Sequence, residues 1–191
     1  MNRAVDALVA GTGLVLTSPI LGIAALVSKL EGKGPVFYRQ TRVGKDGEDF
    51  DVLKLRSMVV GAESLGAGYA VDEGDARITR IGRILRRTSI DELPQLWNVL
   101  CGDMSVIGPR PTLRYQVEQY DEQQRRRLDV RPGLTGWAQV HGRASLPWAE
   151  RIELDVWYVD HRSPRVDLEI LLRTPLALFR GTYRGPTGGW R

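Results

Sequence analysis

A long apolar stretch near the start of the chain limits the possible folds more than any other feature. The 25 residues from Ala4 to Ser28 contain one charged side chain, Asp6. As a helix rising 1.5 Å per residue, a stretch of this length can cross a hydrocarbon layer of about 30 Å. A cleaved signal peptide is disfavoured, because the stretch is long and Arg3 is its only leading charge. We therefore expect a helix in contact with a lipid bilayer.

Ser18 and Pro19 lie in the middle of this stretch. Proline removes a backbone hydrogen bond and kinks a helix, and the Ser18 hydroxyl can satisfy a carbonyl that the proline frees. Lys and Arg favour the cytoplasmic side of a membrane, and here they flank both ends of the stretch. Two topologies stay open: a re-entrant helix that enters and leaves by one face, and a kinked span. The flanking residues are Arg3, Lys29, Lys33, Arg39 and Arg42.

The rest of the chain has the size and charge of one basic domain. The 191 residues carry 27 basic and 23 acidic side chains, for a net charge of +4. This balance indicates an anionic partner, either a phosphate-bearing ligand, a lipid headgroup or a nucleic acid. Because so much of the chain is an apolar stretch, we expect no nucleic-acid partner. The single cysteine, Cys101, excludes an internal disulfide, and two widely spaced histidines argue against a zinc cluster.

The pattern after Pro35 predicts an α+β domain, mainly helical, with a small β-hairpin. Residues 36–43 and 49–58 read as two strands joined by a turn at Asp46 and Gly47, which places Lys54 on the second strand. Residues 60–76 read as a loop. Further helices are predicted at residues 93–101, 113–127, 147–161 and 166–179.

Residues 77–87 have the pattern of a basic amphipathic helix, with five arginines and no acid. Such a helix can lie at a membrane surface or cover the core, and both interpretations stay open. Aromatic and aliphatic side chains further along are candidates for an interfacial surface, although we expect most of them to lie in the core. They are Trp148, Trp157, Tyr158, Leu171, Leu172, Leu176 and Phe179. The expected organisation is a membrane helix at residues 1–30, a domain at 31–180 that forms one unit with it, and a disordered tail at 181–191.

The adjacent carboxylates Asp91 and Glu92 need a local explanation. Ser89 can cap a helix whose third residue is Glu92, or Pro94 can begin a helix with both acids just ahead of it. In either case the acids lie near a helix N-terminus, where a charged cap contributes about 0.3–1 kcal/mol. Taken alone, the pair is explained by capping.

Basic residues around the pair favour a phosphate site instead. Arg86 precedes it, and Arg110 follows between two prolines that stiffen the backbone, so that its guanidinium can meet phosphate oxygens at small entropic cost. Arg131 and Arg143 lie among glycines that permit close approach of backbone to ligand. The glycine-rich segment is a weak signal by itself, since a turn-rich connection with solvated arginines looks the same.

Five segments in order resemble the bacterial sugar transferase family, the monotopic phosphoglycosyl transferases. They are the apolar start with its Ser-Pro, then FDVLKLRSM, SIDELPQLWNVLCGDMSVIGPRP, VRPGLTGWAQVHGR and DVWYVDHRSPRVDLEIL. The resemblance extends from about Arg3 to Phe179 and is to the minimal form of the family. It implies transfer of a sugar 1-phosphate from a UDP-sugar to polyprenyl phosphate, usually undecaprenyl phosphate, at the cytoplasmic face of the bacterial inner membrane. UMP and a polyprenyl-diphosphate sugar would be the products, as the first membrane step of glycoconjugate or exopolysaccharide assembly.

The resemblance also implies roles for individual residues. Asp91 is expected to be the nucleophile that forms a covalent phosphosugar intermediate, and Glu92 to help hold Mg²⁺. The remaining active-site residues that it implies are Lys54, Arg86, Arg110, Arg143 and Asp167, with Ser18 and Pro19 as the break of a re-entrant helix. The chemistry fits, because a carboxylate can approach a charged diphosphate only when metal and arginines screen the repulsion. The sequence does not indicate which UDP-sugar is used, nor the oligomeric state.

Two other functions are compatible with the same residues. A lipid-diphosphate hydrolase would use the acids and arginines with water as the acceptor. A non-catalytic membrane-binding adaptor would use only the N-terminal helix and the basic helix, with Asp91 and Glu92 as caps.

Overall fold

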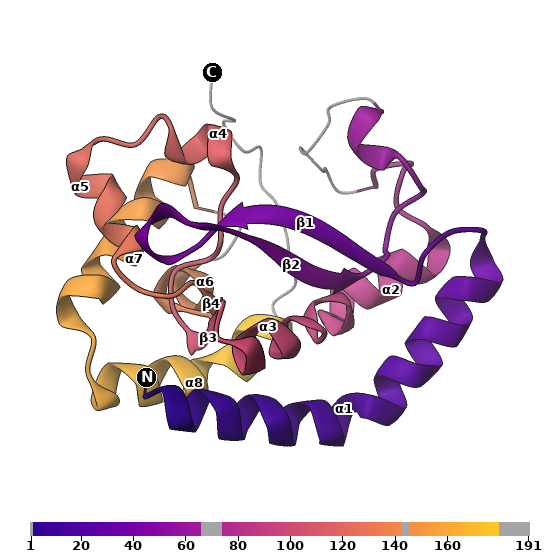
Figure 1. Ribbon diagram of the computed structural model, residues 1–191, viewed down its shortest axis with the longest axis horizontal. Helices are drawn as coiled ribbons and strands as arrows, with labels where there is room; N and C mark the ends of the chain where they lie inside the picture. Colours follow the sequence, from indigo (N-terminus) through magenta and orange to yellow (C-terminus); the bar gives the residue numbers. More distant parts are fainter. Residues whose placement is uncertain (1, 66–73, 143–145, 180–191) are drawn as a thin grey trace.

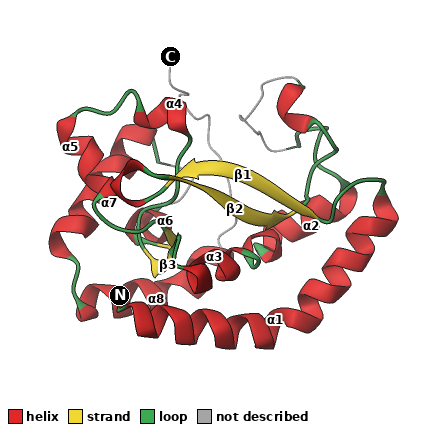
Figure 2. Cartoon of the chain, in the orientation of Figure 1, coloured by secondary structure: helices red, strands yellow, loops and turns green. Residues whose placement is uncertain are grey.

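The computed structural model describes residues 2–65, 74–142 and 146–179. A long N-terminal helix, α1 (Arg3–Glu31), runs along the bottom of the view in Figure 1, and a two-stranded hairpin crosses the middle of the molecule above it. Short helices and a second small sheet lie between the two, as Figure 2 shows. The mainly helical fold with a small hairpin is as the sequence predicts.

Helix α1 is continuous through Pro19 and is bent rather than interrupted (Figure 1). Because proline has no N–H, the carbonyl of Val15 loses its helical partner. The Ser18 hydroxyl donates to that carbonyl at 2.8 Å, as predicted. The expected break at Ser18 and Pro19 is therefore a bend in which the freed carbonyl is satisfied.

Both ends of α1 are attached to the same body of the protein. Near the first turn, the Arg3 guanidinium donates to the carbonyls of Val99 and Leu100. Near the last turn, Arg56 donates to the carbonyls of Ser28 and Gly32 at 2.8 and 3.0 Å and so caps the helix, where a cation also complements the helix dipole. Between these ends, α1 packs against the body through apolar side chains, among them Ala10, Leu14 and Ala24.

Apolar side chains along α1 face away from the body. Val15 and Leu16 are 72% and 71% exposed, and Leu8, Ile23, Leu26 and Leu30 are exposed to a similar degree. In the part of the chain that the structure describes, α1 is the one helix long and apolar enough to cross a membrane, with a mean hydropathy of 1.8. An apolar surface of this extent is typical of a membrane or protein interface.

The hairpin forms as predicted. Strands β1 (Phe37–Val43) and β2 (Asp49–Leu55) pair antiparallel, with Tyr38 opposite Lys54. The connecting turn η1 (Lys45–Gly47) places Asp46 at φ 57° and Gly47 at φ 83°, the left-handed region that Asp and Gly tolerate best. Lys54 therefore lies on β2, where the sequence placed it.

Four of the predicted helices are present close to their expected bounds. They are α2 (Arg80–Thr88), α3 (Gln95–Cys101), α7 (Trp148–His161) and α8 (Pro164–Phe179). Two further short elements are η2 (Ala62–Ser64) and α6 (Trp137–His141). Residues 66–73 of the predicted loop at 60–76, and the predicted tail at 181–191, lie outside the described residues.

The single helix predicted at residues 113–127 is wrong. The segment is divided into α4 (Arg114–Val117), α5 (Glu122–Arg125) and η4 (Arg126–Leu128). The Asp121 side chain accepts from Gln124 N at 2.8 Å and so starts a second helix where the sequence pattern continues the first. The division turns η4 toward the interior.

A second sheet was not predicted. Strand β3 (Ser105–Ile107) pairs parallel with β4 (Gly133–Thr135), each three residues long. A Cβ on Gly133 would lie 2.0 Å from the backbone nitrogen of Gly108, so a side chain there would force the two segments apart. The main core cluster surrounds this sheet and includes Val99, Met104, Ile107 and Ile170, all nearly inaccessible to solvent.

Asp6, the one charge in the apolar stretch, joins α1 to this sheet. Its buried carboxylate accepts from the Ser105 hydroxyl at 2.9 Å and from Val106 N at 2.9 Å. Replacing Asp6 with Ala leaves two buried donors unpaired, a loss of about 1–3 kcal/mol. We expect the unfolding temperature to fall by about 2–10 °C, measured by thermal unfolding in detergent. Asp6→Asn, which keeps one acceptor oxygen, should lose less, and an unchanged unfolding temperature in Asp6→Ala would contradict this role.

Candidate active site

The two adjacent carboxylates lie in a tight turn, η3 (Ile90–Glu92), between α2 and α3. The predicted capping box is absent, because Ser89 takes a left-handed conformation at φ 57° that ends α2, and its side chain makes no capping bond. The other interpretation, a helix that starts at Pro94 with both acids just ahead of it, is supported, because α3 begins directly after Pro94. The turn aims Asp91 and Glu92 toward the hairpin rather than along a helix.

Glu92 is held between two cations from distant segments. Lys54 Nζ on β2 lies 2.8 Å from Glu92 Oε1, and Arg110 Nη2 lies 2.5 Å from the same oxygen. The second oxygen, Oε2, has only a long contact of 3.4 Å with Arg110 Nη1. Three elements that are separate in the sequence therefore meet at one carboxylate.

Charge compensation keeps Glu92 ionised. Burial alone would raise its pKa, but Arg110 and Lys54 hold the pKa of Glu92 well below its usual range. Burial lowers the pKa of Lys54, an effect that the Glu92 charge opposes. Because folding lowers the pKa of Glu92, the ionised carboxylate stabilises the fold at pH values above the pKa that Glu92 has in the unfolded chain. This stabilisation is lost as the pH falls through the lower pKa of the folded state.

The pKa of Asp91 is shifted in the direction opposite to that of Glu92. It is 7% exposed, and burial together with the Glu92 charge raises its pKa. Lys54 and Arg86 oppose this rise without cancelling it. A buried carboxylate next to a second one is costly to ionise, and such groups gather at functional sites.

Arg110 stands at the rim of this cluster with half of its side chain exposed. Pro109 and Pro111 stiffen the backbone on either side of it. Gly133 N donates to the carbonyl of Pro109 at 2.8 Å, and Val43 N donates to that of Thr112 at 2.9 Å. The loop is thus tied to β1 and β4 while the guanidinium stays accessible to a ligand.

The other residues expected at the site have different positions. Arg86 is partly buried near the end of α2, and its charge reaches Asp91. Asp167, at the start of α8, accepts a hydrogen bond from Tyr158 at 2.8 Å, and this bond together with burial raises the pKa of Tyr158. Arg143 lies outside the described residues. Lys54, Arg86, Asp91, Glu92 and Arg110 are the five expected residues that the structure brings together.

One buried ion pair near the site was not predicted. Arg127 in η4 pairs with Asp155 on α7, and both side chains are almost fully buried. In the sequence Arg127 is the last of three successive arginines, and no local signal distinguishes it from its exposed neighbours. Only the folded chain identifies it.

The carboxylate pair is the candidate for a metal ligand in this region. The described residues contain no group of three or more His, Cys, Asp or Glu side chains that could hold a metal on their own. One or two carboxylates with substrate phosphates are, however, an ordinary donor set for Mg²⁺. Glu92 Oε2, with its single long contact, is the freer of the two Glu92 oxygens.

Comparison with known proteins gives one consistent result. Residues 1–181 match the model of a family described as bacterial sugar transferase. The chain is 47% identical to EpsL of Bacillus subtilis, an uncharacterized sugar transferase, over 84% of this chain and 78% of that protein. It is 45% identical to the UDP-glucose:undecaprenyl-phosphate glucose-1-phosphate transferase of Caulobacter vibrioides, over 91% of this chain and 67% of that one.

A third similar protein is longer. The chain is 43% identical to the UDP-N-acetylgalactosamine-undecaprenyl-phosphate N-acetylgalactosaminephosphotransferase of Aeromonas hydrophila, over 95% of this chain but 44% of that protein. The present chain therefore spans less than half of the Aeromonas protein, and about two thirds of the Caulobacter one.

The two carboxylates should differ in their effect on stability. Because the pKa of Asp91 is raised, its ionised form destabilises the fold above that pKa, and Asp91→Asn removes the cost. Glu92→Gln instead leaves Lys54 and Arg110 without their counter-charge. At neutral pH we expect the unfolding temperature of Asp91→Asn to equal or exceed that of the wild type, and that of Glu92→Gln to fall by about 2–8 °C. Thermal unfolding of the two variants side by side measures this, and the reverse order would show that the charges are assigned wrongly.

Proposed function

The chain belongs to the bacterial sugar transferase family, and we propose on that premise that it transfers a sugar 1-phosphate from a UDP-sugar to undecaprenyl phosphate. UMP and an undecaprenyl-diphosphate sugar are the products, and the reaction is a first membrane step in exopolysaccharide or glycoconjugate assembly. The names of the Caulobacter and Aeromonas relatives state this type of reaction for those proteins. The observation that carries the proposal is the buried Asp91 beside a Glu92 that two cations compensate.

The charges of the site suit a diphosphate ligand. Arg110 is half exposed at the rim, so its remaining donors can meet phosphate oxygens in the planar fork that guanidinium provides. Arg86 and Lys54 add positive charge around Asp91. A negative nucleophile can approach a negative diphosphate only in such surroundings, since the attack otherwise meets strong repulsion.

Asp91 is the proposed nucleophile. One of its carboxylate oxygens attacks the sugar-linked phosphorus, the bond from that phosphorus to the bridging oxygen breaks, and UMP leaves with the electron pair. In the second step an oxygen of undecaprenyl phosphate attacks the same phosphorus, and the bond to Asp91 breaks. The carboxylate is regenerated, so the cycle requires no net proton transfer to the protein.

Burial prepares Asp91 for this role. The raised pKa marks a carboxylate that is poorly solvated, and a poorly solvated anion is a stronger nucleophile than a hydrated one. Cationic side chains near Asp91, including Arg86, favour its ionised form and so oppose the effect of burial.

Mg²⁺ is the proposed cofactor, with Glu92 as its protein ligand and substrate phosphate oxygens completing the set. When bound, the ion neutralises negative charge on the diphosphate and the leaving group. The hydrogen bonds from Lys54 and Arg110 orient Glu92 for this purpose. Asp167 and Arg143 are proposed as further active-site residues on the resemblance of their segments to the family.

The proposed location is the cytoplasmic face of the bacterial inner membrane, with α1 as a re-entrant helix. One observation supports this topology over a kinked span: both ends of α1 bond to the same body, through Arg3 and Arg56. A span, kinked or straight, would separate its ends by the thickness of the bilayer. Residues 1–30 and 31–180 then form one unit, since Asp6 is bonded to Ser105.

Covalent labelling tests the chemistry. Purified protein with Mg²⁺ and a panel of UDP-sugars, but no lipid, should release UMP with at least one sugar and gain the mass of a sugar phosphate on Asp91. Asp91→Asn should show neither, while Asp129→Asn, at an exposed aspartate, should behave as wild type. UMP release without a labelled Asp91 would exclude the two-step mechanism. Release of phosphate from undecaprenyl diphosphate, with no use of UDP-sugars, would instead indicate a hydrolase.

Cysteine accessibility tests the topology. In a Cys101→Ser background, single cysteines at the exposed positions Asn2, Lys33 and Glu118 should all react with an impermeant maleimide in inverted vesicles. None should react in right-side-out spheroplasts, because both ends of α1 and the catalytic body share one side. Asn2→Cys reacting from the side opposite to Glu118→Cys would establish a span.

A further inference from the structure

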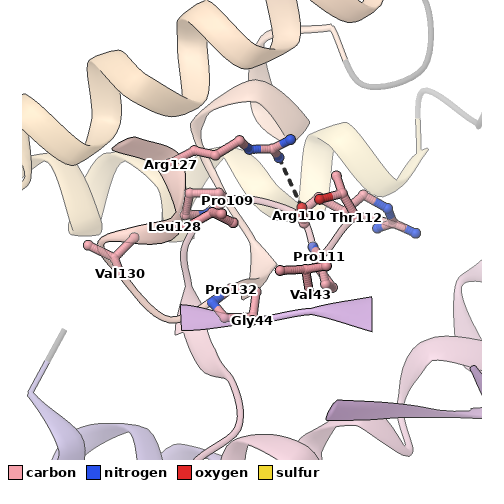
Figure 3. A pocket seen from close by; sticks show the side chains of 10 residues that line it. All are labelled: Val43, Gly44, Pro109, Arg110, Pro111, Thr112, Arg127, Leu128, Val130 and Pro132. Atoms are coloured by element: carbon pink, nitrogen blue, oxygen red, sulfur yellow. Dashed lines mark hydrogen bonds between the residues drawn. The ribbon is translucent and has the colours of Figure 1, made fainter. Parts of the chain in front are cut away.

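Arg127 occupies a central position behind the active-site loop. It is 3% exposed and donates to three acceptors on three segments. Its Nη1 donates to the Tyr120 hydroxyl at 2.5 Å, and its Nη2 donates to Asp155 Oδ2 at 2.5 Å and to the backbone carbonyl of Arg110 at 3.0 Å. Figure 3 shows the last of these bonds, from the Arg127 guanidinium to the loop that carries Arg110.

The contact with Arg110 completes the attachment of the loop. The carbonyls of Pro109 and Thr112 are held by backbone donors of Gly133 and Val43. Between them, the carbonyl of Arg110 is held by the Arg127 side chain. The backbone of Arg110 is thus bonded to Arg127, while its side chain is bonded to Glu92.

Stability alone does not explain this arrangement. Burying an ion pair costs desolvation that the attraction often fails to recover. Asp155 shows this cost, because burial raises its pKa to about 6 even with Arg127 beside it. Its second oxygen, Oδ1, is buried and has no hydrogen-bond partner among the described residues.

Connection of η4 to α7 does not require Arg127 either. The adjacent Arg126 forms an exposed ion pair with Asp160, which joins the same two elements at the surface. What Arg127 adds are the bonds to the Tyr120 hydroxyl and to the Arg110 carbonyl, and only the second of these reaches the candidate site. Only the planar fork of an arginine presents several donors at once in fixed directions, and lysine presents a single ammonium group.

Two aromatic rings fix the fork in place. The guanidinium carbon lies 5.6 Å from the ring centroids of both Tyr120 and Trp148, within the range of cation–π attraction. With Asp155 on one edge and these rings nearby, the side chain has little freedom to move away from the loop.

We propose that Arg127, fixed by Asp155 and Tyr120, positions Arg110 for the transfer reaction by holding its backbone carbonyl. The inference rests on the proposed function for the reaction itself, and it adds two residues, Arg127 and Asp155, that act through Arg110. Arg127 is a positioning residue, since it is buried and its contacts are with the protein.

A kinetic double-mutant cycle tests this inference. In UMP release from the best UDP-sugar, Arg127→Lys should lower kcat about 10- to 100-fold, because a small misplacement of a catalytic group has effects of this size. In an Arg110→Ala background the same substitution should have no further effect, because the group that it positions is gone. Arg126→Lys, the same change at the exposed neighbour, should keep wild-type kcat. Equal effects of Arg127→Lys with and without Arg110, or no effect at all, would overturn the proposal.

A second readout separates this inference from the proposed function. If Arg127 holds Arg110 against Glu92, the two substitutions should not be additive in their effect on the unfolding temperature. The double variant should lose less than the summed losses of Arg127→Lys and Arg110→Ala, and the difference should be at least about 2 °C. This measurement requires no substrate, so it decides the positioning role even if no UDP-sugar releases UMP. Should Arg127→Lys fail to fold, Asp155→Asn, which keeps the shape of the partner, takes its place in both cycles. Strict additivity in either cycle would overturn the inference.

Discussion

The structure depends on the compensation of one carboxylate by two cations. Glu92 can be ionised at low exposure only because Lys54 and Arg110 are both within hydrogen-bonding distance. Each cation comes from a different element, so the hairpin, the η3 turn and the loop around Arg110 must all be correctly placed for the pair to exist. Asp91, next to Glu92, is then shielded from solvent and still lies near the positive charges of Lys54 and Arg86. This combination suits attack on a diphosphate.

A second charge compensation, between Arg127 and Asp155, lies next to the loop around Arg110. Arg127 and Asp155 are farther from solvent than the residues of the active site, and their pairing gives a fixed direction to the Arg110 backbone. A buried pair of this kind contributes little net stability but restricts the number of arrangements that the chain can adopt. The candidate site therefore has an accessible layer, which contains Arg110, and a buried layer, which contains Arg127 and Asp155.

The membrane helix is tied to the same framework. Asp6 bonds to β3, Arg56 caps the other end of α1, and Ala10 and Ala24 pack in the core between them, so the bent helix is fixed to the body along its length. The candidate site and the apolar helix α1 are therefore parts of the same body, without a flexible linker between them.

The sequence by itself determined the elements whose patterns are local. Alternation and the turn at Asp46 gave the hairpin, helical periodicity gave α2, α3, α7 and α8, and the ordered motifs gave the family and the carboxylate pair. Tertiary structure alone decided the left-handed Ser89, the β3–β4 sheet and the roles of Asp6 and Arg127. These features depend on partners far along the chain, since Asp6 and Ser105 are 99 residues apart and Arg127 resembles its exposed neighbours until the fold buries it. Local patterns report the preferences of the backbone, whereas the partner of a buried charge is fixed only when distant segments pack together.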